Sequence, residues 1–435
     1  MNKTIGIRRE DKNEWEKRVP LTPADVSNLI REAGLAFLVQ PSAIRAFPDQ
    51  VYRESGARVD EDLRSADIIL AVKEIPVELL LPGKTYLFFS HTIKGQDYNM
   101  PMLKKLQQLG CNLIDYERIV NEHNQRMLFF GRFAGMAGMI ETLAAYGNKM
   151  DLCGFASPLK RVRHAYEYES VQAAKEEIAD IANEINELGL SFELCPLTVG
   201  FAGYGNVSRG AQEIFDLLPF KTISPAMLPQ MSETFAGDPY HLYKVVFREE
   251  DLAAPPAGRA FDLQDYYDNP EEYTPVFAGY LPFLAILVNC IYWTERYPRL
   301  LTRAYLRDRA SIEGHSNPRV IGDISCDING AIEITHKATK PDQPCFTYLP
   351  AEDSFSDGVK AGGTTVMAVD NLPCEFPRES SQEFSEVLRT LLPALAKTDF
   401  NRPFAGLNLP DPLKKALILQ NGQLTPDYQY LKKFL

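Results

Sequence analysis

The most informative stretch of this sequence reads T-V-G-F-A-G-Y-G-N-V-S-R-G and spans residues 198–210. Gly203 and Gly205 fit the first two glycines of the pattern G-x-G-x-x-G, and the apolar residues before them are typical of a strand. The first glycine of this pattern permits a tight turn, and the second lets the backbone approach a pyrophosphate at a helix N-terminus. Ser208 occupies the third position, and an amphipathic helix is expected directly after the turn. The stretch predicts either a dinucleotide-binding turn or a glycine turn without a ligand.

The residues of this turn are the predicted cofactor contacts. They are Gly203, Tyr204, Gly205, Asn206 and Val207. The next strand along the chain is expected to end near Ser224, where an enzyme that uses NAD places an acid against the ribose 2′-hydroxyl. No acid is present there, so the sequence favours NADP(H), with NAD(H) as the alternative, and Ser224 becomes a further cofactor candidate.

Three continuous apolar runs precede this stretch, and polar, ionisable residues follow each of them. The runs cover 68–72, 85–89 and 112–114, and they are followed by Lys73-Glu74, by His91 and by Glu117. Continuous apolar runs that alternate with helical patterns are typical of a parallel sheet covered on both faces. Because ligands bind at the carboxyl ends of the strands in such sheets, we expect these ionisable residues to meet at one edge.

Composition and charge exclude several classes of protein. The chain has 435 residues and a formal net charge of −12, which argues against a general nucleic-acid binder with a basic face. We see no apolar signal segment at the N-terminus, and the apolar stretch over 280–293 is too short to span a membrane. The seven cysteines show no C-x-x-C spacing, so no metal site is expected. A cytoplasmic protein that binds small molecules, and neither nucleic acid nor membrane, is the expectation.

Several motifs occur in order along the chain and together resemble one known family. They include Arg8 to Asp11, Trp15 to Pro23, Val72 to Pro76, Phe88 to Lys94, the glycine turn, Asn289 to Trp293 and Asp323 to Asp327. On these motifs the sequence resembles the alanine dehydrogenase/saccharopine dehydrogenase superfamily. Within it, the sequence is most similar to the lysine–ketoglutarate reductases, including the reductase half of aminoadipic semialdehyde synthase.

The resemblance implies an α/β fold with two Rossmann-like domains, whose parallel sheets are separated by a cleft for substrate and cofactor. It also implies a discontinuous substrate domain made of residues 1–135 plus 328–435. The dinucleotide-binding domain is then inserted between these segments as residues 136–327.

The activity implied by the resemblance is that of a lysine-forming saccharopine dehydrogenase, an NAD(P)-dependent oxidoreductase acting on CH–NH donors. Lysine and 2-oxoglutarate condense to an imine, and hydride from the nicotinamide reduces it to saccharopine. Such chemistry requires proton transfer by groups that titrate near neutral pH. Lys73 and His91 are the catalytic candidates, because burial can lower the pKa of a lysine and histidine titrates near neutral pH without help. The alternatives are an exposed strand-end lysine and a structural histidine.

Saccharopine has three carboxylates, so cationic side chains are expected around it. Arg18 matches the carboxylate-binding position of the family, and Lys94 and Arg126 are further substrate-binding candidates. Arg126 also fits an exposed hairpin arginine. Glu117 either orients the catalytic lysine, senses the substrate amine or is a surface acid.

Two further residues are expected near the nicotinamide. Asn289 is expected to line its pocket, and Asp327 matches a family aspartate beside it. Because Asp327 precedes Asn329-Gly330, a role in a turn is the alternative.

Two other functions remain open at this point. One is an alanine dehydrogenase-like enzyme that acts on a smaller amino acid, and the other is a catalytically silent regulator that binds a dinucleotide. The presence of Lys73, His91 and Arg18 argues against the silent regulator. The sequence fixes neither the physiological direction nor the oligomeric state.

Overall fold

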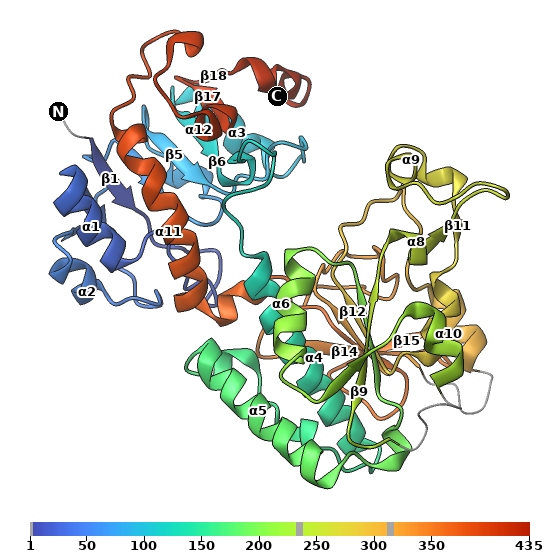
Figure 1. Ribbon diagram of the computed structural model, residues 1–435. Helices are drawn as coiled ribbons and strands as arrows, with labels where there is room; N and C mark the ends of the chain where they lie inside the picture. The colour runs from blue at the N-terminus through green and yellow to red at the C-terminus, as the bar shows by residue number, and fades with distance from the viewer. Residues whose placement is uncertain (1–2, 232–237, 311–316) are drawn as a thin grey trace. The chain divides into compact units, whose positions relative to one another are not determined.

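The computed structural model describes residues 3–231, 238–310 and 317–435 (Figure 1). The chain forms two compact units, the first made of Met1–Phe130 with Pro377–Leu435 and the second of Gly131–Phe376. Residues 131–135 lie in the second unit, and so does the segment 328–376, which the resemblance also assigns to the substrate domain. The reason is that this segment supplies three strands of the second unit's sheet.

The first unit contains an eight-stranded, mostly parallel sheet in the order β18-β17-β6-β5-β4-β1-β2-β3. The strands are β1 (Thr4–Ile7), β2 (Ala36–Val39), β3 (Arg58–Val59), β4 (Ile68–Leu70), β5 (Thr85–Phe88), β6 (Asn112–Asp115), β17 (Leu417–Gln420) and β18 (Gln423–Leu424). All residues of β4, β5 and β6 are buried, as the continuous apolar runs predict. Only β17 and β18, from the C-terminal segment, are antiparallel to their neighbours.

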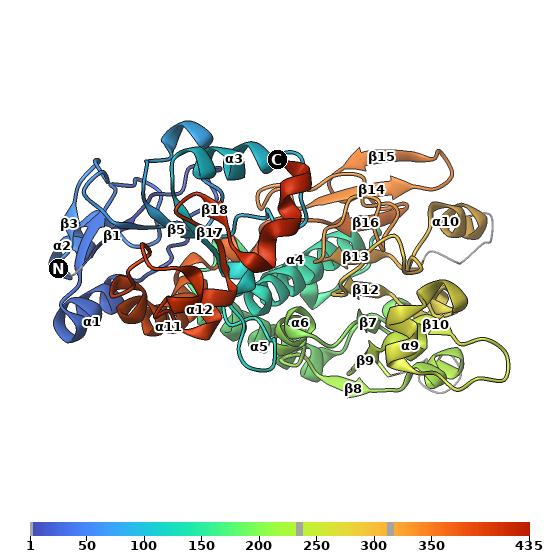
Figure 2. The ribbon, with the colours of Figure 1, turned by 90° about the horizontal axis from the view of Figure 1, so that it is seen from above.

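Helices cover both faces of this sheet. Helix α1 (Pro23–Ala33) begins where the Thr22 hydroxyl accepts a hydrogen bond from the Asp25 backbone N–H, at 3.3 Å. It packs beside α11 (Pro377–Ala396), whose Ser385 hydroxyl donates to the Asp25 carboxylate at 2.5 Å (Figure 1). Helix α3 (Met100–Gln108) lies on the other face (Figure 2). The C-terminal segment thus completes the core of the first unit.

The second unit contains another eight-stranded sheet, in the order β15-β14-β16-β13-β12-β7-β9-β8. The strands are β7 (Thr198–Ala202), β8 (Phe220–Thr222), β9 (Leu242–Phe247), β12 (Ile286–Asn289), β13 (Val320–Asp323), β14 (Cys345–Leu349), β15 (Ser354–Asp357) and β16 (Thr364–Met367). Pairing is parallel except around β14. The order of the strands in the sheet differs here from their order in the sequence, because β9 lies between β7 and β8.

Two glycine contacts join helix α4 (Gly131–Leu152) to helix α6 (Asn206–Phe215). A Cβ atom on Gly210 would overlap the backbone oxygen of Arg132, and one on Gly135 would overlap that of Val207. Only glycine, which has no Cβ atom, allows the two helices to approach this closely at both positions.

The connection after β9 is irregular and rich in aromatic residues. It contains α8 (Glu249–Leu252), β10 (Ala253–Ala254), α9 (Leu263–Asp268) and β11 (Thr274–Pro275). Tyr266 and Tyr273 form a small core of their own there. The predicted fold class, two α/β domains with mostly parallel sheets, is confirmed.

Candidate active site

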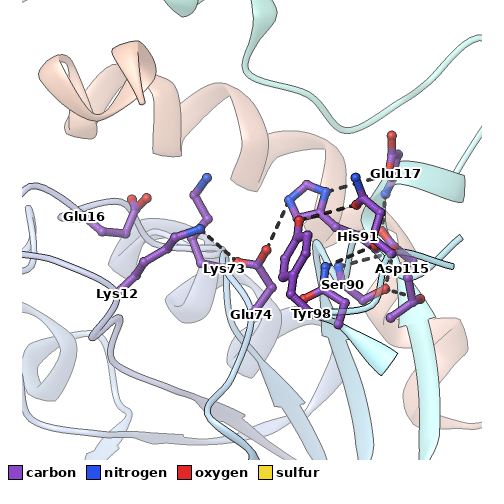
Figure 3. Close-up of polar contacts among 12 residues, drawn as sticks. Lys12, Glu16, Lys73, Glu74, Ser90, His91, Tyr98, Asp115 and Glu117 are labelled. Atoms are coloured by element: carbon purple, nitrogen blue, oxygen red, sulfur yellow. Dashed lines mark hydrogen bonds and ion pairs between the residues drawn. The ribbon is translucent and has the colours of Figure 1, made fainter. Parts of the chain in front are cut away.

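Three neighbouring strand ends of the first unit bring four ionisable side chains together. Lys73 and Glu74 follow β4, His91 follows β5 and Glu117 follows β6 (Figure 3). These strands are adjacent and parallel, so their carboxyl ends lie at one edge of the sheet. We refer to these four residues as the acid–base rim. The rim brings together Lys73, His91 and Glu117, as the apolar runs predict.

The buried carboxylate of Glu10 holds the backbone at Lys73 in place. The Lys73 backbone N–H donates to Glu10 Oε2 at 3.0 Å, and that of Val72 donates to Glu10 Oε1 at 2.6 Å. Burial lowers the pKa of the Lys73 ammonium, and the positive charge of Arg18 lowers it further, while Glu16 opposes the shift. Burial also raises the pKa of Glu10 to about 7. Lys73 is therefore easier to deprotonate than an ordinary lysine.

His91 lies between two carboxylates of the rim. Its Nε2 is 3.7 Å from Glu74 Oε1, and its Nδ1 is 3.9 Å from Glu117 Oε2. Figure 3 shows Glu74 between the imidazole and the ammonium of Lys12, which is 3.3 Å from Glu74 Oε2. Burial lowers the pKa of His91, and the two carboxylates act in the opposite direction.

The backbone of His91 is in the left-handed region, with φ of 49°. A non-glycine residue there is uncommon and is held in place by its surroundings. The ring stacks on Phe89, with 6.3 Å between centroids and 18° between planes. The strand-end turn and Phe89 therefore fix where the imidazole points.

A second buried carboxyl supports the rim from β6. Asp115 Oδ2 accepts hydrogen bonds from the hydroxyl and the backbone N–H of Ser90, and Oδ1 accepts from the Glu117 N–H at 2.8 Å. Burial raises the pKa of Asp115 to about 6. Asp115 thus ties the ends of β5 and β6 together next to His91 and Glu117.

The predicted carboxylate-binding cations differ in their surroundings. Arg18 is buried, and its guanidinium makes a bidentate pair with the Glu16 carboxylate. Arg18 Nε is 2.8 Å from Glu16 Oε1, and a terminal nitrogen of Arg18 is 2.6 Å from Glu16 Oε2. Arg126 is exposed and donates to Glu117. Lys94 is exposed in the turn that follows His91. Arg126 therefore contacts the acid–base rim directly, whereas Arg18 acts on Lys73 through its charge.

The glycine turn of the second unit follows β7, as predicted. Gly203 has φ of 95°, and a Cβ there would lie 3.1 Å from Ile291 Cγ2, so both backbone and space favour glycine. A Cβ on Gly205 would meet no described atom within 4 Å. Gly205 directly precedes α6, so open space faces the N-terminal end of this helix, where Asn206 and Val207 begin.

A cavity of about 470 Å³ opens beside this turn. It is lined by Gly203 and Gly205, by Glu249 after β9, by Ile291 after β12, and by Tyr266 and Tyr267 of α9. Its size falls in the range of small-molecule sites, and it lies at the carboxyl ends of three adjacent strands. The residues present fit a dinucleotide. We refer to this space as the tyrosine-lined cavity.

Outside the turn, three predicted cofactor residues are not among those that line this cavity. Ser224 follows the edge strand β8 and is not among the residues that line the cavity, because β9 separates β8 from β7. Asn289 is buried at the end of β12, and its amide donates to Asp323 Oδ1 at 2.8 Å. Asp327 is exposed, and its backbone oxygen accepts from the Gly330 N–H at 2.9 Å, which agrees with the turn alternative.

The predicted site residues omit several groups that matter here. Glu10 and Glu16 lie within the motifs quoted above, but nothing in their spacing shows that they are buried under Lys73. Asp115 could have been found, since it ends an apolar run. Glu249 and the tyrosines of α9 become visible only once β9 is known to flank β7. In the part of the chain that the structure describes, no group of three metal-ligating side chains occurs, and no helix is long and apolar enough to cross a bilayer.

Known proteins resemble both units. Residues 6–137 match the family described as "Alanine dehydrogenase/PNT, N-terminal domain". The alpha-aminoadipic semialdehyde synthase of Arabidopsis thaliana is 38% identical over 450 residues, which cover 99% of this chain and 41% of that protein. The lysine-forming, NAD(+)-dependent saccharopine dehydrogenase of Neurospora crassa is 24% identical, with 91% of each chain covered.

The fold has a solved counterpart. The structure of an L-alanine dehydrogenase matches with a TM-score of 0.62 and 18% identity, covering 99% of this chain and all of that one. At this identity the match concerns the fold alone. The chain also spans less than half of the semialdehyde synthase that it resembles. Nearly the whole of this chain is thus similar to part of alpha-aminoadipic semialdehyde synthase, and residues 6–137 match the alanine dehydrogenase/PNT N-terminal domain.

Proposed function

We propose that this chain is a lysine-forming saccharopine dehydrogenase, also called lysine–2-oxoglutarate reductase. The observation that carries the proposal is the acid–base rim, where a half-buried lysine and a histidine, both with lowered pKa values, lie on adjacent strand ends. The names of the relatives from Arabidopsis thaliana and Neurospora crassa support the same substrate class. The reaction joins lysine, 2-oxoglutarate, NAD(P)H and a proton into saccharopine, NAD(P)+ and water.

The proton transfers can be divided between Lys73 and His91. The ε-amine of lysine must lose a proton before it attacks the keto carbon, and a lysine of lowered pKa, Lys73, is a suitable base. The carbinol oxygen must then leave as water, and His91 is a suitable donor of the proton. Glu74 and Glu117 keep the imidazole oriented from both sides. When bound, NAD(P)H would supply the hydride that reduces the resulting imine.

Cationic side chains near the rim have a separate role. Arg126 is the best candidate to bind a substrate carboxylate, because its side chain is exposed at the edge of the rim. Lys94 adds a second exposed positive charge. Arg18 is assigned a positioning role, since Glu16 occupies its fork and its charge helps to lower the pKa of Lys73.

The cofactor is a nicotinamide dinucleotide, bound by Gly203, Tyr204, Gly205, Asn206 and Val207. NADP(H) is the form that the sequence favours, with NAD(H) as the alternative. We do not assign a direct contact with the cofactor to Ser224, Asn289 or Asp327, because these residues are not among those that line the cavity. A cytoplasmic location remains a prediction.

Steady-state oxidation of NADPH and NADH tests the proposed reaction. Turnover is expected with lysine plus 2-oxoglutarate and should require both. Comparable turnover with pyruvate plus ammonia would favour an alanine dehydrogenase-like enzyme, which the family match over residues 6–137 keeps as the second candidate. Dinucleotide binding without turnover of any such pair would mean a silent regulator.

A further inference from the structure

Two fully buried hydroxyls flank His91. Ser90 and Thr92 are both 0% exposed, whereas the His91 side chain between them is 37% exposed. The hydroxyl oxygens of Ser90 and Thr92 are 2.8 Å apart, within hydrogen-bond distance. Because buried polar groups are costly without partners, two such hydroxyls in contact require an acceptor beside them.

Asp115, at the end of β6, is this acceptor. Its Oδ2 accepts hydrogen bonds from the Ser90 hydroxyl and, at 3.2 Å, from the Ser90 backbone N–H (Figure 3). A serine hydroxyl has a single hydrogen, so when this hydrogen is donated to Asp115, the Thr92 hydroxyl is the donor to Ser90 Oγ. The hydrogen bonds thus run in one direction, from Thr92 through Ser90 to the carboxylate. We refer to these three residues as the hydroxyl chain.

Hydrogen bonds from the following turn fix the same backbone. The Asn99 amide donates to the His91 backbone oxygen at 3.2 Å, and the Gly95 N–H donates to the Thr92 oxygen at 2.9 Å. With a φ of 49°, His91 has a conformation that is unfavourable for a non-glycine residue and persists only where the surroundings impose it. The hydroxyl chain holds the residues on both sides of His91, so it is placed to impose this conformation.

The position of the imidazole depends mainly on this backbone. The ring nitrogens are 3.7 Å from Glu74 Oε1 and 3.9 Å from Glu117 Oε2. Both distances are longer than a hydrogen bond, so neither carboxylate fixes the ring by a direct bond. Asp115 Oδ1 also accepts from the Glu117 backbone N–H at 2.8 Å. One buried carboxylate therefore holds the backbone beside His91 and the backbone of Glu117.

We propose that Asp115 is a positioning residue of the active site, which acts through the two hydroxyls that flank His91 to keep the imidazole between the carboxylates of the rim. This inference rests on the proposed function, because it explains how the proton donor of that reaction is held in place. Asp115 is fully buried, so its effect on the reaction is indirect.

A double-mutant cycle with His91 tests this proposal. Asp115→Asn keeps the shape of the side chain but replaces one acceptor oxygen with an NH2 group, so either Ser90 or the Glu117 N–H loses its acceptor. We expect kcat for NADPH oxidation with lysine and 2-oxoglutarate to fall about 10- to 100-fold, the effect of a small misplacement of a reacting group.

The same substitution should have little effect once the imidazole is absent. In a His91→Asn background, Asp115→Asn should change kcat less than about twofold, because residues that act as a unit are not additive. The Kd for NADPH should stay within about twofold in all variants. An equal loss of kcat in both backgrounds would overturn the proposal.

The titration of His91, followed by NMR of the labelled imidazole, gives a readout that does not depend on turnover. Burial lowers the pKa of His91 in the folded protein. If Asp115→Asn releases the imidazole from its half-buried place, this pKa should rise toward the ordinary value of histidine. Loss of the negative charge of Asp115 would by itself lower the pKa, so the two effects have opposite signs. A fall, or no change, would contradict the proposal.

Variants of Thr92 separate the hydroxyl from the rest of the side chain. Thr92→Val has nearly the same shape without the hydroxyl and should lower kcat about tenfold, whereas Thr92→Ser keeps the hydroxyl and should stay within about twofold of the wild type. Ser385→Ala is the matched control, because the fully buried Ser385 hydroxyl donates to Asp25 at 2.5 Å, away from the rim. It should lower stability and leave kcat unchanged. Equal kcat values for the two Thr92 variants, or a similar loss in Ser385→Ala, would refute the positioning role.

The proposed function fails in a different way. If the wild type does not turn over lysine and 2-oxoglutarate, the function is wrong, and the NMR titration still shows whether Asp115 holds His91. If the wild type is active and Asp115→Asn lowers kcat equally in both backgrounds, only the role of Asp115 is wrong.

Discussion

The acid–base rim of the first unit and the tyrosine-lined cavity of the second are both carboxyl ends of parallel sheets, yet they are built differently. The rim contains lysine, histidine and glutamates over the buried carboxyls of Glu10 and Asp115. The cavity is lined by glycines and tyrosines. The same strand-end geometry thus holds groups that move protons in one unit, and aromatic walls and bare backbone that suit a nucleotide in the other. Substitutions in the rim should therefore affect turnover, and substitutions around the cavity should affect binding or stability.

The largest expected effect is on turnover after loss of the Lys73 amine. Lys73→Met should lower kcat about 10³-fold, within the range for a general acid–base group. The measurement is NADPH oxidation with saturating lysine and 2-oxoglutarate. Lys104→Met, on the exposed side of α3, is the matched control and should retain full activity. A loss of less than tenfold in Lys73→Met would remove Lys73 from the chemistry.

The next largest effect is expected on the stability of the second unit. Gly210→Ala places a Cβ against the backbone oxygen of Arg132, so α4 and α6 must separate, at a cost of about 3 kcal/mol in the free energy of unfolding. Urea unfolding measures this change. Gly205→Ala is the control, since its Cβ meets no described atom within 4 Å and should weaken nucleotide binding without loss of stability. Equal unfolding free energies for the two variants would contradict the close packing of α4 on α6.

His91→Asn should reduce kcat about 10²-fold. Asparagine is the right replacement because residue 91 has positive φ, which asparagine tolerates better than glutamine does. His123→Asn, at an exposed position, serves as the control. A variant that is merely misfolded would also lose heat stability, so its melting temperature is recorded alongside, and unchanged kcat would exclude His91.

Buried carboxyls with raised pKa values make the stability of both units depend on pH. In the second unit, Glu141 and Glu375 are buried, and burial raises the pKa of Glu141 to about 7 and that of Glu375 well above its ordinary value. A carboxyl with a raised pKa in the folded state contributes stability below its ordinary pKa. That contribution is lost as the pH rises through about 7.

Glu375→Gln should therefore stabilise the protein at pH 8 by on the order of 1–3 kcal/mol relative to the wild type, with little gain at pH 5. Urea midpoints at the two pH values measure the difference. Glu187→Gln, exposed on α5 (Val171–Leu188), should show no such dependence. A gain of equal size at both pH values would mean that the effect does not arise from titration.

The smallest effect is expected at the exposed edge of the rim. Arg126→Gln should raise the KM for 2-oxoglutarate about fivefold and change the unfolding free energy by less than about 1 kcal/mol, since exposed ion pairs contribute little. Steady-state kinetics with varied 2-oxoglutarate check this. A change in kcat alone would point to a role for Arg126 in the chemistry rather than in binding.

Much of this contrast can be predicted from the sequence, because it depends on local patterns. Apolar runs identify β4, β5 and β6 and thereby bring Lys73, His91 and Glu117 to one edge. The G-x-G pattern identifies the turn after β7. What the sequence does not contain is the spatial order of strands, so it does not show that β9 separates the strand end at Ser224 from the glycine turn. The pairing of Arg18 with Glu16 is equally hidden, because two residues in an irregular segment leave no periodic signal.

The division of roles between the two units is tested most directly by titrating NADPH into the double variant Lys73→Met/His91→Asn, next to the wild type. If the rim acts on protons and the glycine turn holds the nucleotide, the Kd for NADPH should stay within about twofold while turnover is lost. A Kd that rises in parallel with the loss of turnover would mean that Lys73 and His91 hold the nucleotide, and the assignment of chemistry to the first unit would be wrong.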